Sequence, residues 1–559
     1  MKKNYLVVVF LLLISLTAKS QLPVLLKDIN SGWNSQSINF IGLPNGKTVF
    51  QANNGINGAE LWITDGTTAN TYLLKDINPN AGSSDPSDFI VYNNMVYFSA
   101  DDGIHGKEFW VTDGTAAGTF MVKDICPGVS GSNSKYFTIF KNKLYFNAWD
   151  GFHGFELWVS DGTSLGTQLL IDINQISNPI SGSNPRLFIE YNNKLYFQAN
   201  DGVHGEELWV TDSSSLGTQM VKDICPGKAG SFITPQLVYK NKLYSNAWDS
   251  LHGSEMWVSD GTDTGTQILK DICPGLFGSG AGGNLIEYNN KLFFSARDTI
   301  HGFELWVSDG TDTGTQMLKN IYLDITSPPF GDNSYPSNFI VFNNKLIFVA
   351  EDAVNGIEPW VTDGTTIGTS LLVNLAPFNF SSIDIVNFYG FTMFNKKLYF
   401  IAANTTFPDY ELWSTDGTVA GTCIVMPIKA DKINALTNNS NNRLLTVCNG
   451  ALYFRGYYTY SEGDEPYVIT IDSTNTATFV EKTNNPLSIS PNPCSTWLKV
   501  NGAVIGQSAI IYDVLGKEVL SVKINEGLFV DVSTLIDGIY IVVIGNNHFK
   551  LIKEGDLRK

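Results

Sequence analysis

The sequence is short of charge, and of basic charge in particular. Charged residues make up 16% of the chain, against about 25% in an average globular protein. Lysine and arginine number 36 and aspartate and glutamate 54, so the formal net charge is −18 at pH 7. Nucleic acids and anionic membrane surfaces are bound through clustered basic residues. The composition therefore argues against both as partners, and it is compatible with cations, neutral glycans and proteins.

Cysteine is also scarce, with six residues in a chain of 559. Cys126, Cys225 and Cys273 stand at the same place in a repeated Asp-Ile-Cys-Pro-Gly phrase, where other copies carry asparagine. We expect equivalent positions of neighbouring repeats to lie beyond the ~7 Å limit between Cα atoms for a disulfide. These cysteines are therefore interpreted as small tolerated residues, and no C-x-x-C metal motif is present.

Long apolar runs are missing, apart from residues 5–16, which follow the basic pair Lys2 and Lys3. This run is too short to span a bilayer. A basic start, a short apolar run and small residues after it are typical of a secretory signal peptide. We predict a signal peptide over residues 1–20, with cleavage between Ser20 and Gln21. No transmembrane segment is predicted.

Helical periodicity and familiar catalytic motifs are missing too. No His-Glu-x-x-His motif or phosphate-binding loop occurs, and acidic pairs are so frequent that none is diagnostic. The chain instead repeats the motif Glu-Leu-Trp-Val-Thr/Ser-Asp-Gly-Thr about once every fifty residues, and a degenerate copy begins at Glu465. A fixed period of this size indicates an array of one supersecondary unit. The repeated tryptophans, which we expect in the core, are Trp62, Trp110, Trp158, Trp209, Trp257, Trp306, Trp360 and Trp413.

One repeat, residues 135–173, contains four short runs rich in aromatic and β-branched residues, separated by Asn, Asp and Gly. This pattern predicts a four-stranded antiparallel meander, the unit of a propeller blade. Residues 23–30 copy the fourth strand of the repeat without its first three, and such a strand can complete the last blade and close the ring. Residues 477–481 are a rival fourth strand for the ninth unit. The fold class is thus all-β, a β-propeller of eight or nine four-stranded blades over residues 21–484, followed by a small C-terminal β-sandwich over residues 485–559.

With the strands of a blade named A to D, the A–B and C–D turns emerge on one face and the B–C and D–A loops on the other. The Asp-Gly-Thr column, which Asp212-Ser213-Ser214 breaks in the fourth repeat, marks the C–D hairpin turns. The D–A loops at residues 174–184, 275–283 and 324–336 differ in length. Variable loops on a rigid scaffold commonly carry ligands, so the face of the B–C and D–A loops is the expected binding surface.

The B–C loop recurs as Asp/Asn-Gly-x-His-Gly-x-Glu and supplies the candidate site residues. The candidate ligand-binding histidines are His105, His153, His204, His252 and His301. The candidate metal ligands are Asp102, Asp150, Asp201, Glu108, Glu156 and Glu207. Calcium is the ion that this donor set predicts, since it prefers oxygen ligands. The competing interpretation is structural: the aspartate closes a turn, the glutamate accepts backbone N–H bonds, and the histidine completes the network. We favour it, because a residue present in every unit suits a scaffold.

After residue 484 the repeat stops and a different series of strands begins. It contains a Ser-Pro-Asn-Pro opening at residues 490–493, a Tyr-Asp-x-x-Gly-Lys-x-Val turn at 512–519 and a Leu-x-x-Gly-x-Tyr-x-Val strand at 535–542. This series resembles the type A C-terminal sorting domain of the type IX secretion system of Bacteroidetes. The resemblance implies export across the outer membrane, recognition by the type IX translocon, and a secreted or surface location.

The repeats resemble the Glu-Leu-Trp/Asp-Gly-Thr repeat family of large secreted bacterial proteins, which implies no settled activity. We therefore expect an extracellular binding or adhesion propeller for an unknown glycan or protein. The alternatives are a polysaccharide lyase or glycosidase with its site in the propeller channel, and a purely structural surface protein. A single cluster of non-repeating acidic, His, Tyr and Arg residues on the axis would favour the enzyme.

Overall fold

The computed structural model describes residues 23–176, 182–281, 284–323, 333–375, 383, 390–403, 410–430, 445–456, 463–470, 488–490, 497–501, 508–513, 517–524, 529–544 and 547–553. The chain divides into two compact units, Met1–Asp472 and Ser473–Lys559. The predicted signal peptide, its cleavage site at Ser20 and Gln21, and the predicted boundary after residue 484 lie outside the described residues. No helix long and apolar enough to cross a membrane occurs in the described ranges.

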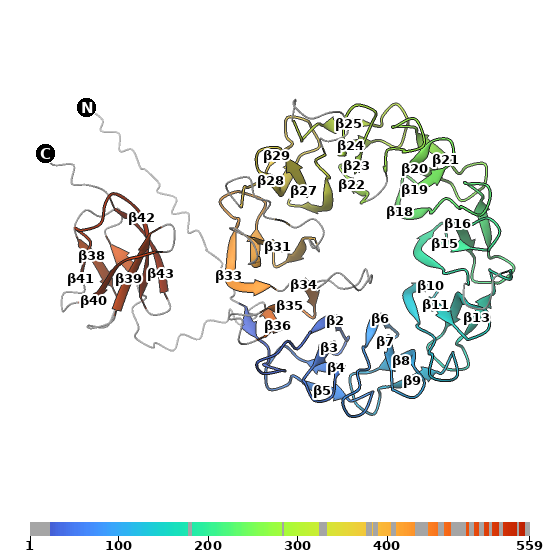
Figure 1. The fold of residues 1–559 in the computed structure, drawn as a ribbon, viewed down its shortest axis with the longest axis horizontal. Coiled ribbons are helices and arrows are strands. Elements are labelled where there is room, and N and C mark those ends of the chain that lie inside the picture. The colour runs from blue at the N-terminus through green and yellow to red at the C-terminus, as the bar shows by residue number, and fades with distance from the viewer. Residues whose placement is uncertain are drawn as a thin grey trace, which may run out of the picture. The chain divides into compact units, whose positions relative to one another are not determined.

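The first unit is a propeller, and its described residues form nine four-stranded antiparallel sheets. Figure 1 shows these sheets around a ring, with the first strand of each toward the centre. The all-β prediction is confirmed, and of the two predicted blade counts the larger is found. Blades 1 to 3 comprise β2 (Ile38–Gly42), β3 (Thr48–Asn53), β4 (Ala59–Thr64) and β5 (Tyr72–Lys75); β6 (Ser87–Tyr92), β7 (Met95–Asp101), β8 (Lys107–Thr112) and β9 (Phe120–Lys123); and β10 (Lys135–Phe140), β11 (Lys143–Trp149), β12 (Phe155–Ser160) and β13 (Gln168–Ile171).

Blades 4 to 8 continue this order without a crossover. They comprise β14 (Arg186–Tyr191), β15 (Lys194–Asn200), β16 (Glu206–Thr211) and β17 (Gln219–Lys222); β18 (Thr234–Tyr239), β19 (Lys242–Asp249), β20 (Gly253–Ser259) and β21 (Gln267–Lys270); β22 (Ile286–Tyr288), β23 (Lys291–Ala296), β24 (Glu304–Ser308) and β25 (Gln316–Lys319); β26 (Ser337–Phe342), β27 (Lys345–Asp352), β28 (Gly356–Thr362) and β29 (Ser370–Leu371); and β30 (Thr392–Phe394), β31 (Lys397–Ala403), β32 (Tyr410–Thr415) and β33 (Cys423–Ala430).

The ninth blade joins the two ends of the propeller. Its strands are β34 (Leu445–Cys448), β35 (Ala451–Gly456) and β36 (Glu465–Thr470), and its fourth strand is β1 (Val24–Leu25). Val24 pairs with Val468 in antiparallel register. The prediction that the strand before the first blade completes the last one is therefore confirmed. The rival fourth strand at residues 477–481 lies outside the described residues.

Apolar side chains join each blade to the next. Trp110 of blade 2 packs with Leu61 and Ile63 of blade 1, and Trp158 of blade 3 packs with Phe109 of blade 2. All eight repeated tryptophans are only 5–9% exposed, which confirms the core interpretation. An indole wedged in this way buries on the order of 200 Å², so this column stabilises the ring.

The C–D turns have the hairpin chemistry that the sequence predicts. Asp65 Oδ1 accepts hydrogen bonds from Thr67 N at 3.0 Å and Thr67 Oγ1 at 2.6 Å. The irregular copy keeps this geometry, since Asp212 Oδ1 accepts from Ser214 N at 2.9 Å. Ser213 takes the glycine's place at a φ of 91°, where a side chain is strained. The turn therefore tolerates a change that its geometry disfavours.

The second unit is a small β-sandwich of two sheets, β37-β38-β41 and β40-β39-β42-β43. Buried residues from both sheets, including Leu498, Val530, Ile511 and Val542, form one core. The strands are β37 (Ser488–Ser490), β38 (Trp497–Asn501), β39 (Ser508–Asp513), β40 (Glu518–Lys523), β41 (Phe529–Asp531), β42 (Gly538–Ile544) and β43 (Asn547–Lys553). The predicted C-terminal sandwich is therefore present.

Closure of the ring can be tested at Leu26, which directly follows β1. Leu26 is 1% exposed and packs with Phe40, Phe50 and Tyr453 across the junction of blades 1 and 9. Leu26→Asp buries an unpaired charge there, so we expect it to reduce the stability of the propeller by about 3 kcal/mol or more. The measurement is the midpoint of thermal unfolding. Val24→Asp is the matched control on the same strand, because Val24 is 60% exposed; similar midpoints for the two variants would contradict closure through β1.

Candidate functional site

The B–C and D–A loops share one face of the propeller, which we call the loop face. The opposite face, formed by the A–B and C–D turns, is the turn face. Where the structure describes them, the D–A loops of the loop face are held between two blades. In one such loop, Ser132 donates its N–H to Glu108 of blade 2 at 2.8 Å, and its carbonyl accepts from Trp149 N of blade 3 at 3.0 Å. The loop face is therefore a continuous, hydrogen-bonded surface and not a set of separate hairpins.

The glutamate column is the anchor of this surface. Glu108 is fully buried, and its carboxylate accepts the N–H groups of Ile125 and Cys126 at 3.0 Å each, besides that of Ser132. Glu156 accepts from Ile173, Asn174 and Ser183 in the same way. These contacts match the structural interpretation of the glutamates.

Other glutamates of the column hold their loops similarly. Glu207 accepts from Ile224 N at 3.2 Å, Cys225 N at 3.1 Å and Ser231 Oγ at 2.6 Å. At the ring closure Glu465 accepts from Ile29 N at 2.8 Å and Asn30 N at 3.1 Å. The same anchor thus holds the segment after β1 to blade 9, at the point where the chain has no continuous connection.

The candidate histidines each pair with the aspartate three residues before them. His105 Nδ1 lies 2.7 Å from Asp102 Oδ2, and the backbone N–H of His105 donates to Asp102 Oδ1 at 2.8 Å. The same pairs recur at Asp150–His153, Asp201–His204, Asp249–His252 and Asp298–His301, with Nδ1–Oδ2 distances of 2.7, 2.6, 2.8 and 3.0 Å. The histidine side chains are 30–43% exposed. Each loop therefore presents a fixed imidazole at the surface.

These pairs shift the acid–base behaviour of the loops. The hydrogen bond to Asp102 raises the pKa of His105, and the charges of Asp102, Asp124 and Glu108 act in the same direction. Burial alone would raise the pKa of Asp102, but the hydrogen bonds from His105 and Ile104 hold it below its usual value. The pairs are built alike in blades 2 to 5, so a proton is held more tightly at each of these histidines than in free solution.

Where histidine is absent, an asparagine takes over the same place. In blade 1, Asn57 Nδ2 donates to Asp76 Oδ2 at 2.8 Å, and Asn57 Oδ1 accepts from Asn54 Nδ2 at 2.9 Å. In blade 1 this position therefore connects the B–C loop to the aspartate at the end of strand D. In blade 7, Asn355 Nδ2 donates to Asp352 Oδ2 at 2.8 Å, so asparagine there keeps the contact that histidine makes within the loop.

The candidate metal ligands have different partners within each loop. Asp102, Asp150 and Asp201 bind their histidines, whereas Glu108, Glu156 and Glu207 bind backbone N–H groups of the D–A loops. In the described part of the chain, no group of three or more His, Cys, Asp or Glu side chains is placed to hold a metal ion. The five cysteines within the described residues are free.

One group of charges does not follow the repeat. Arg186 Nη2, at the start of the innermost strand of blade 4, lies 2.7 Å from Glu206 Oε1. Burial lowers the pKa of Lys135 on blade 3. The charge of Arg186 lowers this pKa further, whereas that of Asp88 raises it. Burial also lowers the pKa of Lys107, although the charges of Asp88, Asp85 and Asp101 act to raise it. This charged group lies on blades 2 to 4, close to the inner strands.

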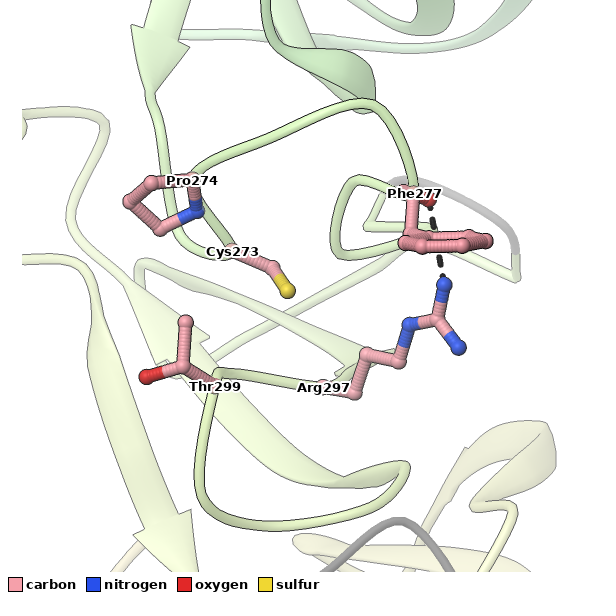
Figure 2. Close-up of a pocket in the computed structure, with 5 residues that line it drawn as sticks. All are labelled: Cys273, Pro274, Phe277, Arg297 and Thr299. Atoms are coloured by element: carbon pink, nitrogen blue, oxygen red, sulfur yellow. Dashed lines mark hydrogen bonds between the residues drawn. The ribbon is translucent and has the colours of Figure 1, made fainter.

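Two cavities lined by described residues lie on the loop face, each between a D–A loop and the B–C loop of the following blade. Figure 2 shows the first, of about 280 Å³, which is lined by Cys273, Pro274, Phe277, Arg297 and Thr299. The guanidinium of Arg297 donates to the carbonyls of Phe277 at 3.1 Å and Gly278 at 3.0 Å. We call it the Arg297 cavity; it is mostly apolar.

The second cavity, of about 680 Å³, lies at the junction of blades 9 and 1, and we call it the closure cavity. Its lining comprises Asn30, Gly32, Trp33, Asn34, Gln36, Asn53, Asn54, Gly55 and Gly463. Sequence analysis singled out neither cavity. The signal that could have indicated them is the departure of single residues from the repeat. Asn34 occupies the position of Gly131 and Gly230 in other D–A loops, and Arg297 occupies the position of Asp101 in blade 2.

Comparison with known families identifies the second unit. Residues 488–554 match the family described as the secretion system C-terminal sorting domain. The chain carries an export signal. It is therefore exported, and is either secreted or attached to the outer cell surface. No curated protein matches the chain in sequence.

Three solved structures illustrate the structural matches. The computationally designed Ika8 protein is 17% identical, with 70% of this chain and 99% of that chain covered and a TM-score of 0.36. PorZ of Porphyromonas gingivalis, a surface component of its type-IX secretion system, is 13% identical, with 91% and 74% covered and a TM-score of 0.35. The β-propeller domain of the Trilobed protease from Pyrococcus furiosus is 10% identical, with 60% and 98% covered and a TM-score of 0.31. Similarity at this level carries no functional inference.

The buried glutamates give the propeller a pH dependence. Burial raises the pKa of Glu60, Glu156, Glu207, Glu304 and Glu465 to about 7, while their hydrogen-bond donors oppose the shift. A carboxyl with a folded-state pKa above its ordinary 4.5 binds its proton more tightly when folded. Its contribution to stability is present below pH 4.5 and is lost as the pH rises through about 7. The raised pKa of the histidines acts in the same direction.

We therefore expect the midpoint of thermal unfolding to fall between pH 5.5 and pH 8.5. The measurement is calorimetry or circular dichroism in buffers of equal ionic strength. A midpoint that rises over this interval would mean that the backbone N–H donors outweigh burial and keep these carboxylates ionised throughout.

Proposed function

We propose that this protein is an extracellular binding protein, exported by the type IX secretion system, whose ligands bind on the loop face of the propeller. The single observation that carries the proposal is the position of the two cavities. Both lie on the loop face, and both are bordered by D–A and B–C loops that the buried glutamates hold in place. A fixed surface with local variation suits recognition, because little conformational freedom is lost when a ligand binds.

The exposed side chains of the loop face support this proposal. Five candidate histidines, each oriented by an aspartate, offer a ring nitrogen for a hydrogen bond to a glycan hydroxyl or to a peptide group. The residue before each of them is apolar and exposed: Ile104, Phe152, Val203, Leu251 and Ile300. A polar and an apolar group side by side in several blades are compatible with adhesion to an extended partner.

Calcium stays a prediction of the sequence. The carboxylates named for it already have partners in each loop, so we expect ligand binding without added calcium. The enzymatic alternative would draw on the charged group around Arg186 and Glu206, which breaks the repeat. Binding without cleavage of the bound glycan separates the two functions.

The loop-face proposal can be tested by covering one face at a time. Ile56→Cys with Ile300→Cys places two thiols on the B–C loops, where both residues are exposed. Leu165→Cys with Ile367→Cys places two on the C–D turns of the turn face, where both residues are 96–97% exposed. Each protein is coupled to maleimide-polyethylene glycol, as is the unsubstituted protein, which corrects for labelling of native cysteines.

The probes are an array of neutral and acidic glycans together with purified collagen and fibronectin. We expect the loop-face label to reduce binding about tenfold or more and the turn-face label to leave it unchanged, because only the first covers the ligand surface. Retained binding in a chelating buffer is expected, and its loss would support calcium in the loops. Binding that is blocked from the turn face, or no binding to any probe, would count against the proposal.

The export route is tested separately. Deletion of residues 488–554 removes the sorting domain, so we expect the propeller to stay inside the cell envelope of a host that has the type IX system. Fractionation and immunoblotting of medium, surface and periplasm measure this. The full chain in a strain without the translocon is the second arm, and its arrival at the surface there would contradict the type IX route.

A further inference from the structure

The closure cavity lies beside the loop that follows β1, a strand that is not joined along the chain to the other three strands of its blade. Residues 30–36 follow β1, which belongs to blade 9, and lead into β2 of blade 1. Ser35 N donates to Asp464 O at 2.8 Å, and Asn53 N donates to Ser35 O at 2.7 Å. The loop is thus fixed to both blades, although its sequence is unlike the other D–A loops.

The described lining of the closure cavity is uncharged and rich in amides. Five of its lining residues are Asn30, Asn34, Gln36, Asn53 and Asn54, and none of the nine described lining residues carries a charge. An amide offers a donor and an acceptor at once, as a sugar hydroxyl does. A carboxylated or sulfated ligand would require lysine or arginine in the lining. The cavity therefore suits a neutral, hydroxyl-rich ligand.

Trp33 supplies the apolar half of such a site. It is 76% exposed and borders the cavity, whereas the eight repeated tryptophans are buried. An indole presents a flat apolar face with one polar edge. The C–H face of a pyranose ring is flat and apolar in the same way, while the hydroxyls at its rim are polar. An exposed indole next to a row of amides therefore matches both parts of a sugar ring.

Several amides are already fixed in place by the protein. Asn34 Oδ1 accepts from Asp464 N at 3.0 Å, Asn30 Nδ2 donates to Asn34 O at 3.3 Å, and Asn53 Oδ1 accepts from Gly55 N at 2.7 Å. Within the described residues, these bonds leave Asn34 Nδ2, Asn53 Nδ2 and the whole amide of Gln36 for a ligand. The side chains of Asn34 and Asn53 are thus held before binding, which reduces the entropy lost on binding.

The Arg297 cavity provides the contrast. It lies at the corresponding place between blades 5 and 6, but it is smaller, mostly apolar, and bordered by a guanidinium that binds two loop carbonyls. The amide lining thus does not follow from the position between two loops. It belongs to the residues of the closure loop.

We infer that the closure cavity is a binding site for an uncharged glycan, with a sugar ring stacked on Trp33 and its hydroxyls bonded to Gln36, Asn34 and Asn53. This inference rests on the proposed function, because it names the ligand class for one part of the loop face. It also assigns the ligand to one junction and not to the repeated histidine loops.

The test uses the full exported protein and named probes. These are cellohexaose, mannohexaose and xylohexaose as neutral glycans, with hexagalacturonate as the acidic counterpart, measured by calorimetry or a biosensor. We expect at least one neutral glycan to bind. Trp33→Ala should then weaken binding about fivefold or more, Gln36→Ala should weaken it as well, and Trp33→Phe should retain part of it because a ring remains.

Phe120→Ala is the control, since Phe120 is an aromatic residue that is 51% exposed on the outermost strand β9, outside the loops of the loop face. It should bind the glycan like the unsubstituted protein. Equal thermal midpoints of the Trp33 and Phe120 variants exclude misfolding, which is not expected for exposed residues. Loss of binding in the polymer-labelled loop-face protein but not in Trp33→Ala would overturn the cavity site and leave the proposed function standing. Preference for hexagalacturonate, or no saccharide binding at all, would also overturn the inference.

Discussion

The buried glutamate of the third strand, present in every blade but the eighth, supports the architecture of the loop face. Its carboxylate accepts the N–H groups at the end of the outermost strand and at the serine of the D–A loop, as Glu108 does for Ile125, Cys126 and Ser132. That serine then accepts a hydrogen bond from the next blade, as Ser132 does from Trp149. Since unpaired buried N–H groups are costly, loss of the carboxylate would release the loop from both blades.

The same interaction closes the ring. At blade 9 the strand β1 comes from the other end of the propeller. Glu465 accepts hydrogen bonds from the residues after β1, as the other buried glutamates do from the residues after their own outermost strands. The apolar cluster around Leu26, Phe50 and Tyr453 completes the junction. Ring closure therefore uses the same kinds of contact as the other blades. It requires only that a strand with the sequence pattern of the fourth strand precedes the first full repeat.

Because the described loops are anchored alike, their variation is confined to the residues between the anchors. Asparagine replaces histidine in blade 1 and keeps a polar bridge, Arg297 braces an apolar cavity, and the closure loop carries Trp33 among amides. The scaffold thus separates two tasks: repeated residues fix the backbone, and non-repeated residues on the same face are available for recognition. The sorting domain adds the location, which is outside the cell or on its surface.

The sequence by itself determined the strands, the blade as a unit, the turn chemistry and the strand that completes the last blade, because all of these are local patterns repeated at a fixed period. It also pointed to the sorting domain through a matching series of strands. Only the tertiary structure decided that there are nine blades, that Asp102 binds His105 while Glu108 binds the D–A loop, and where the cavities lie. Those features depend on which loops meet across a blade junction, where residues as distant as Asn34 and Gly463 come together; a periodic sequence does not encode that contact.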